Sequence, residues 1–188
     1  VGRIGAQFKD TSDKDTDIFF ATRADGGSLA KAMQIDSSGF VTKPLQPSAS
    51  VWTNGSAAQG GHANKIGDTV WVPNTEHWDI GGVYDTSNGK FTAPVDGIYQ
   101  ISFGTNLKLN SLSDGDWFDI RLLRNGSTHH VHYDLMKYGE WHWYSWTDLV
   151  QLSATDYLQI AFYANSSKTI GVDASNSQWN RASFCLVS

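Results

Sequence analysis

Five side chains with metal-ligand chemistry lie close together in the second half of the chain. They are His129, His130, His132, Asp134 and His142. If this segment is a strand, alternate residues share a face, so His130 and His132 point the same way as Asp134. Three copies around a threefold axis would present six imidazoles, which suits an octahedral transition metal. The spacing predicts an axial metal site at His130 and His132; the alternative is imidazoles exposed at a hairpin or hydrogen-bonded within an interface.

Aspartates form two further groups that could bind a hard cation such as calcium. The groups are Asp10, Asp13, Asp15 and Asp17, and Asp114, Asp116 and Asp119. Calcium takes clustered carboxylate and carbonyl oxygens, but neither group has the ligand order of an EF-hand loop. Aspartate is also an ordinary turn former, so solvated turns are the alternative. We expect no required cofactor.

The chain lacks the short motifs of common catalytic sites. It has no Gly-x-Ser-x-Gly elbow, no His-Glu-x-x-His helix motif and no glycine-rich phosphate loop. Its single cysteine, Cys185, cannot form an intrachain disulfide, and its place in an alternating segment favours packing over reactivity. Paired carboxylates for glycoside cleavage could meet only in the fold. We expect that the protein is not an enzyme.

The eight tryptophans are many for 188 residues. Their flat rings can stack on sugar rings or apolar patches at low cost in side-chain entropy. Most should belong to the core or to an interface, so the candidates for receptor binding are those near predicted loops. These are Trp78, Trp141 and Trp179, together with Tyr138 and His142.

Charge and hydropathy exclude two classes of partner. The net charge is −5 and no basic cluster is present, so neither nucleic acid nor an anionic membrane is an expected partner. No apolar run approaches the roughly 20 residues of a membrane-spanning helix, so we expect no membrane insertion.

Short alternating apolar runs, broken by Gly, Asn, Asp and Ser, predict an all-β protein that could hold these side chains in place. Turn signals such as Asn125-Gly126 separate some of the strands. The expected strands lie near residues 69–73, 90–93, 97–107, 116–124, 128–135, 140–152, 156–164 and 180–187.

Two prolines, Pro44 and Pro47, mark a change in composition. They predict an extended connector over residues 44–50, between a β-rich segment at 1–43 and a larger domain at 51–188. The short strands expected before the connector cannot bury a core of their own.

The segment Glu140–Trp146 carries bulky side chains on both faces of its expected strand. Trp141 and Trp143 share one face with Ser145, and the large side chains between them share the other. One face should pack into the core and the other against a neighbouring subunit, which predicts self-association.

The stretch 81–103 contains, in order, Tyr84-Asp85, a glycine-containing turn, Phe91-Thr92, Pro94-Val95 and Gly97-Ile98-Tyr99. This order resembles the globular heads of the C1q-like family, although Ala93 stands where many relatives have a cysteine. The resemblance implies a C1q/TNF-like jelly-roll β-sandwich over residues 51–188 that assembles as a homotrimer.

The start of the chain contains Arg3-Ile-Gly-Ala6, Phe20-Ala-Thr-Arg23 and Met33-Gln-Ile-Asp-Ser-Ser-Gly-Phe-Val41. These motifs resemble a shaft repeat of bacteriophage tail fibres. The resemblance implies the trimeric tip of a virion tail fibre, outside the host cell, that recognises a surface receptor, either a glycan or a protein. The alternatives are a secreted or cell-surface C1q-like ligand, and a fibre tip that degrades polysaccharide.

Overall fold

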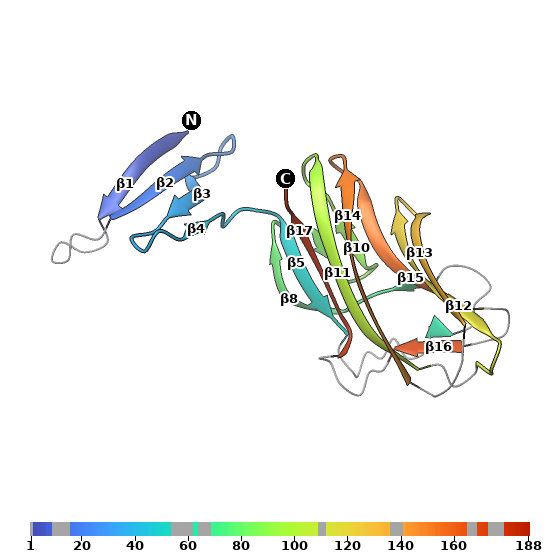
Figure 1. Cartoon of the computed structure of the whole chain (residues 1–188). Coiled ribbons are helices and arrows are strands. Elements are labelled where there is room, and N and C mark those ends of the chain that lie inside the picture. Colours follow the sequence, from blue (N-terminus) through green and yellow to red (C-terminus); the bar gives the residue numbers. More distant parts are fainter. Residues whose placement is uncertain are drawn as a thin grey trace. The chain divides into compact units, whose positions relative to one another are not determined.

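The computed structural model describes residues 2–8, 16–53, 62–63, 69–108, 112–135, 141–164, 169–172 and 179–188. The chain divides into two compact units, Val1–Gln46 and Pro47–Ser188, which we call the amino-terminal unit and the head. The regular structure of the described residues is β-strand apart from a single 3₁₀ position at Trp179 (Figure 1). The expectation of an all-β protein is confirmed. Among the described residues, no helix has the length and apolar character needed to cross a bilayer.

The amino-terminal unit is one antiparallel sheet of four strands in sequential order. Its strands are β1 (Arg3–Phe8), β2 (Thr16–Thr22), β3 (Ala30–Ile35) and β4 (Val41–Thr42). The turn between β3 and β4 forms because Asp36 accepts hydrogen bonds from the backbone N–H groups of Ser38 and Phe40, each 2.9 Å long. Gly39 supplies the positive φ of +85° that this turn needs.

The two faces of this small sheet differ. On one face the Phe19 ring covers Gly5, where an added Cβ would lie 2.7 Å from the ring, and the Lys31 ammonium lies 5.1 Å from the ring centroid. The cross-strand pairs Ile4–Phe20, Phe20–Met33, Ile18–Ile35 and Ile35–Val41 form the other face. We call it the amino-terminal apolar face; within one chain it is largely exposed, Ile4 by 73 %.

The head is a sandwich of two antiparallel sheets (Figure 1). The smaller sheet has the order β13 (Ser127–Leu135), β12 (Trp117–Arg124), β15 (Tyr157–Ala164), β10 (Lys90–Thr92), β9 (Tyr84–Asp85), with β7 (Thr69–Trp71) also paired to β15. The larger sheet has the order β6 (His62–Ala63), β16 (Thr169–Val172), β11 (Gly97–Lys108), β17 (Arg181–Leu186), β5 (Ser48–Trp52), β8 (Thr75–Ile80), with β14 (Trp141–Leu152) also paired to β11.

The hydrophobic core lies between the two sheets and is rich in aromatic rings. Phe91 and Phe184 stack across it with centroids 4.7 Å apart, and Tyr99 meets Phe91 edge to face at 5.5 Å. Trp71 is fully buried, and its indole N–H donates a 2.9 Å hydrogen bond to the Thr53 hydroxyl. This hydrogen bond satisfies the buried indole N–H and holds the ring of Trp71 in place.

Two Asn-Gly pairs form the turns that the sequence predicts. Asn125 and Gly126 both have positive φ angles, 52° and 78°, as the two-residue turn of the β12–β13 hairpin requires. Gly89 has φ +73°, and an added Cβ would lie only 2.7 Å from the Trp71 carbonyl oxygen. Glycine is therefore needed at Gly89 for both conformation and space.

Strand β5 begins within the connector expected over residues 44–50. Ala49 and Val51 are buried in the core, and the strand pairs with β17 on one side and β8 on the other. The serines that alternate with these small apolar residues lie on the outer face of the sheet. Because neither residue type is typical of a strand, this segment was not predicted to be one. Pro47 accepts a hydrogen bond from the backbone N–H of Leu186, so residues 47 and 186 meet at what we call the proximal end of the head.

Candidate functional site

The outer face of the larger sheet carries small hydroxyl side chains in a row across four strands. Thr147 of β14 is paired with Ser102 of β11, Ser102 with Ser183 of β17, and Ser183 with Ser50 of β5. The hydroxyl oxygens of Ser102 and Thr147 are 3.1 Å apart and hydrogen-bonded. All four side chains are short, and Ser50 is buried whereas Thr147 is exposed.

A hollow of about 600 Å³ lies on this face, toward the distal end of the head, opposite Pro47. Trp143 and Trp179 line it, and the other contributors are mostly small or polar, among them Ser102, Gly104, Ser145 and Ser183. The two indoles meet edge to face, with centroids 5.6 Å apart and planes at 71°. In this arrangement the two indole rings do not stack face against face. The Trp143 side chain is 60 % exposed. The hollow therefore offers aromatic surface beside hydroxyl groups.

A buried asparagine holds the chain where it enters this hollow. Asn180 is fully buried, and its side-chain oxygen accepts hydrogen bonds from the Thr105 hydroxyl at 2.7 Å and the Asn106 N–H at 3.0 Å. Its backbone carbonyl accepts a third bond from the N–H of Thr53. The residues on either side, Trp179 and Arg181, are thus attached to a fixed point of the fold.

Among the described residues that line the hollow, Arg181 is the one with a charged side chain. It lies beside Gly104 of β11 and Trp52 of β5 in the register of the sheet, and it is exposed. Within the described part of the chain, its guanidinium has no carboxylate partner.

The structure separates the residues predicted to bind a receptor. Trp179 lines the hollow, whereas Trp78 lies on edge strand β8, in register with Ser50 on the same outer face, and is 52 % exposed. His142 lies on the inward face of β14, 6.2 Å from the Tyr144 ring. Strand β14 includes Trp141, whose side chain is outside the described structure, and Tyr138 lies outside the described residues.

Two residues of the hollow, Trp143 and Arg181, were not among the predicted receptor-binding residues. Alternation in β14 indicates that Trp143 lies opposite Tyr144 and Trp146, and those two side chains indeed pack against the core. The contact between Trp143 and Trp179 could not be predicted, because thirty-six positions separate them and their meeting depends on how β14 and β17 flank β11.

The histidine cluster lies along the rim of the sandwich, where β13 and β14 form facing edges of the two sheets. His130 Nδ1 is 3.1 Å from Asp148 Oδ2, and its ring stacks on Trp146 at 5.3 Å. His132 meets the Tyr144 ring edge to face at 5.6 Å. Both imidazoles thus have partners within their own chain.

Tyr144 completes this rim. Its hydroxyl donates a 3.1 Å hydrogen bond to Asp134, and burial, with the nearby Asp134 charge, raises the pKa of Tyr144. No group of three His, Cys, Asp or Glu side chains suited to a metal ion forms among the described residues. An axial metal at His130 and His132 stays a prediction.

Three of the aspartates considered as calcium ligands accept hydrogen bonds within the chain, and Asp114 lies exposed in a turn. Asp17 accepts hydrogen bonds from the Gln34 amide at 2.6 Å and the Ser37 N–H at 3.1 Å. Asp116 accepts one from the Ser113 N–H at 2.7 Å, and Asp119 binds the Arg121 guanidinium at 2.8 Å. The described part of the chain does not include Asp10, Asp13 or Asp15. Calcium binding also stays a prediction.

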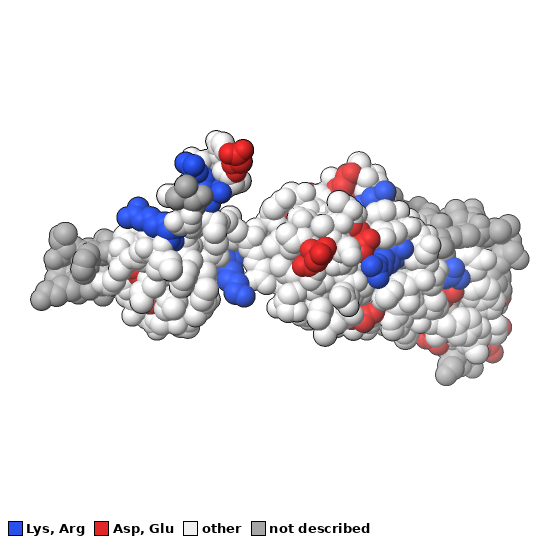
Figure 2. All heavy atoms as spheres, turned by 90° about the horizontal axis from the view of Figure 1, so that it is seen from above, with Lys and Arg blue, Asp and Glu red and all other residues white. Residues whose placement is uncertain are grey.

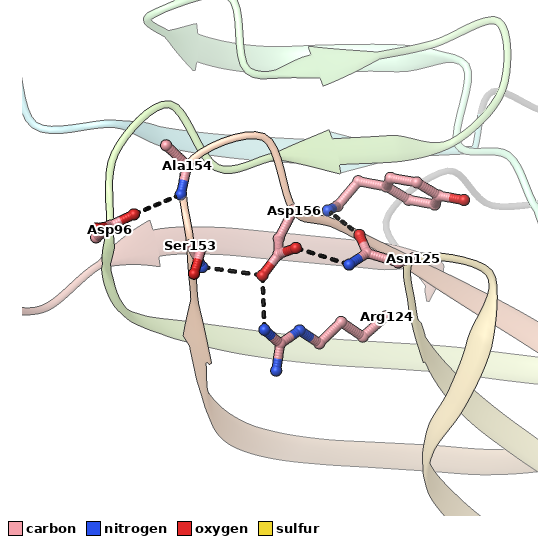
Figure 3. Close-up of polar contacts among 7 residues, drawn as sticks. Asp96, Arg124, Asn125, Ser153, Ala154 and Asp156 are labelled. Atoms are coloured by element: carbon pink, nitrogen blue, oxygen red, sulfur yellow. Dashed lines mark hydrogen bonds and ion pairs between the residues drawn. The ribbon is translucent and has the colours of Figure 1, made fainter.

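Another charged cluster, around Asp156, joins two turns (Figure 3). The carboxylate accepts hydrogen bonds from the Asn125 amide and the Arg124 guanidinium, each 2.6 Å, and from the Ser153 N–H at 2.9 Å. These contacts, with Asn125 first, lower the pKa of Asp156 to about 2. Asn125 in turn accepts a bond from the N–H of Tyr157. The cluster ties the β12–β13 turn to the β14–β15 turn, which is a structural role.

Charges are mixed on the surface of the head. Figure 2 shows acidic and basic side chains interspersed over the side in view, without a patch of one sign. This pattern agrees with the scattered charges of the sequence.

The fold is similar to that of a solved structure. No family model and no curated protein matches the chain. The globular domain of the zebrafish complement 1qA protein is similar in structure, with a TM-score of 0.52 and 15 % sequence identity over 76 % of this chain and 98 % of that domain. At this identity the comparison establishes the fold. The predicted all-β, C1q-like jelly-roll sandwich is confirmed for the head.

Proposed function

We propose that this chain forms the trimeric distal part of a bacteriophage tail fibre, or of a similar receptor-binding protein, and attaches a particle to a glycan or protein on a host cell. The observation that carries the proposal is the uncovered apolar surface in both units. The shaft-like motifs at residues 1–43 and the C1q-like fold of the head support it.

The head carries an exposed apolar patch at the proximal half of the larger sheet. Its members share the outer face and lie in adjoining rows: Ile80, Ile98, Leu149 and Val187, with Trp78 at the edge. We call this set the proximal apolar patch. Leu149 alone is 60 % exposed. Large apolar side chains that stay exposed on one face of a sheet mark protein–protein contacts, so we assign the patch to the contact between heads.

The amino-terminal unit needs partners for a different reason. It is a single sheet, and among its described side chains only Asp17, Phe19 and Ala21 are buried. A lone four-stranded sheet with one uncovered apolar face gains little from folding alone. Three copies that pack their amino-terminal apolar faces around an axis would bury Ile4, Ile18 and Phe20 together.

Adhesion follows from this assembly without a catalytic residue. Three heads present three copies of each outward-facing loop with fixed spacing, and contacts to repeated surface groups add through effective concentration. Each contact can then be weak while the whole tip holds firmly.

Two measurements test the proposal. Light scattering after gel filtration of the complete 188-residue chain should give three times the mass of one chain, and a single-chain mass at micromolar concentration would contradict the assembly. Purified protein should also adsorb to susceptible cells and compete with the intact particle. Adsorption to no cell type would contradict the function.

A second candidate function is that of a secreted or cell-surface C1q-like ligand. The similarity to a complement 1qA head favours it, since that fold is shared. Collagen-like Gly-x-y repeats or coiled-coil heptads upstream of residue 1 in the parent gene would favour this candidate, and further copies of the motifs at 1–43 would favour the fibre.

A further inference from the structure

We propose that an apolar stripe on strand β13 of one head docks into the hollow of the next head around the threefold axis. The stripe, which we call the β13 stripe, consists of Val131, Tyr133 and Leu135. This inference rests on the proposed function, because it names the two surfaces through which neighbouring copies of the trimer meet.

The β13 stripe is exposed within one chain. All three of its side chains are exposed, Tyr133 by 55 %. His130 and His132, which alternate with them, face β14 at the rim of the sandwich. The stripe therefore points the other way, from the outer face of the smaller sheet. Apolar side chains in a row on an exposed edge strand mark a surface that contacts another molecule.

A threefold ring needs two different surfaces on each head. A head meets its two neighbours through different sides, so every contact in the ring joins unlike surfaces. The head has exposed apolar side chains on the outer face of each sheet. Trp143 and the proximal apolar patch lie on the larger sheet, and the β13 stripe lies on the smaller one. The two sheets thus supply the two halves of one contact.

Contacts across the rim show which residues of β13 and β14 lie at the same height along the sandwich. His130 Nδ1 is 3.1 Å from Asp148 Oδ2, and the Tyr144 hydroxyl is 3.1 Å from Asp134 Oδ2. Residue numbers thus rise along β13 as they fall along β14. The two strands run antiparallel at the facing edges of the two sheets.

The same relation sets the β13 stripe level with the hollow. Tyr133 lies at the height of Ser145, and Leu135 lies at the height of Trp143; both of these β14 residues line the hollow. We place the threefold axis along the strands, because the stripe and the exposed residues of β14 both extend in that direction. Rotation about such an axis leaves heights unchanged, so Tyr133 of one head meets the hollow of the next.

The two surfaces are complementary in shape and chemistry. The hollow of about 600 Å³ lies where short residues such as Ser102 and Gly104 leave room, whereas the stripe projects large side chains. The ring of Tyr133 packs on indole surface of the hollow, and its hydroxyl accepts a hydrogen bond from Arg181. The proximal apolar patch continues the contact on the same face of the larger sheet.

Cross-linking tests the match in height. In a Cys185→Ser background, Val131→Cys and Thr147→Cys place thiols at equal height on the two outer faces of one head. A bismaleimide with a reach of about 10 Å, the usual spacing of packed sheets, should join the three chains covalently on a denaturing gel.

A matched control places one thiol at a different height. Val95→Cys, in the turn before β11, replaces Val131→Cys beside the same Thr147→Cys and should leave the chains unlinked. Equal cross-linking in the two double variants, or none in either, would overturn the inference.

A charge in the β13 stripe tests the contribution of Tyr133. Tyr133→Lys brings an ammonium into the contact beside Arg181 and should raise the dissociation constant of the trimer by about tenfold or more. Because Tyr133 is exposed within one chain, the variant should keep the unfolding transition of a folded head. Thr128→Lys adds the same charge at another exposed position of β13 and should assemble as the wild type does. Assembly of undiminished strength in Tyr133→Lys would overturn the inference.

A receptor is the competing occupant of the β13 stripe. A Tyr133→Lys protein that stays trimeric and no longer adsorbs to cells would assign the stripe to the receptor and overturn the inference. The wild type separates the two proposals. A single-chain mass would contradict the trimer of the proposed function, whereas a trimer in which the thiols of Val131→Cys and Thr147→Cys do not cross-link would contradict the docking of the stripe alone.

Discussion

The side-chain oxygen of Asn180 accepts a 2.7 Å hydrogen bond from the hydroxyl of Thr105, seventy-five positions earlier in the chain. The same oxygen accepts the Asn106 N–H, so one carboxamide fastens the start of β17 to β11. Asn180 is fully buried, which means that water cannot replace these bonds. The geometry of the hollow thus depends on a residue that does not line it.

Replacing this residue should destabilise the head. Asn180→Ala leaves the Thr105 hydroxyl and the Asn106 N–H without this acceptor, and we expect the free energy of unfolding to fall by about 2–4 kcal/mol. Thr105→Val removes one donor together with its need for a partner and should cost about 1 kcal/mol. Chemical denaturation at equal chain concentration measures both variants, and similar losses in the two would contradict the assignment.

Asp156 should make the free energy of unfolding depend on pH in the acidic range. Its pKa is about 2 in the folded chain, below the value of about 3.9 of an unfolded aspartate. A lowered pKa means that the carboxylate stabilises the fold fully above the unfolded pKa and loses this effect as the pH falls through about 2.

The effect should be visible as a difference in unfolding free energy between the wild type and a variant without this charge. The gap in unfolding free energy between the wild type and Asp156→Asn should shrink as the pH is lowered from about 5 to about 2. Asp114→Asn, at an exposed turn of the head, serves as the control and should show no comparable change. A gap that stays constant over this range would show that the Asp156 charge does not stabilise the turns.

Alanine substitutions at two glycines should distinguish the cost of a left-handed backbone conformation from the cost of a steric clash. Gly82→Ala meets no heavy atom within 4 Å at φ +62°, so it should cost only the left-handed conformation, about 1 kcal/mol. Gly89→Ala has a similar φ of +73° and also meets the Trp71 carbonyl at 2.7 Å, so we expect about 3 kcal/mol. Thermal unfolding should rank the two variants in that order, and equal melting temperatures would rule out the steric contribution.

The proximal apolar patch makes a prediction about assembly. Leu149→Lys places a charge within the proposed contact between heads and should shift the population toward single chains, because burying an unpaired ammonium is costly. Val95→Lys changes another exposed apolar residue, in the turn before β11, and should stay trimeric. Analytical ultracentrifugation across a concentration series measures the association of both variants. A Leu149→Lys trimer that dissociates no more readily than the wild type would exclude this patch from the contact between heads.

Local patterns in the sequence were enough to predict most of the head. Each of the eight predicted strands coincides with a strand of the structure, because period-two alternation and Asn-Gly turns act over a few residues. Strands β5 and β8 were missed: β5 alternates serine with small apolar residues, and β8 is an edge strand with mostly exposed side chains. The short strands β6, β9 and β16 were not predicted either.

The candidate site could be predicted only in part. Aromatic composition pointed to Trp179, but the hollow depends on which strands become neighbours, and sequence patterns carry little information on that. Arg181 could not be singled out from the sequence, because its place in the hollow depends on the pairing of β17 with β11 and β5. His130 and Asp148, far apart in the sequence, meet only because β13 and β14 form facing edges of the two sheets.

Gly104 lines the hollow at a position where the fold has room for a side chain. Its nearest neighbour for an added Cβ is the Tyr144 carbonyl oxygen, 4.0 Å away, so alanine or serine can replace it without disturbing the sandwich. Either residue would narrow the cavity from within. The sequence can therefore vary at residue 104 and reshape this cavity while the sandwich keeps its fold.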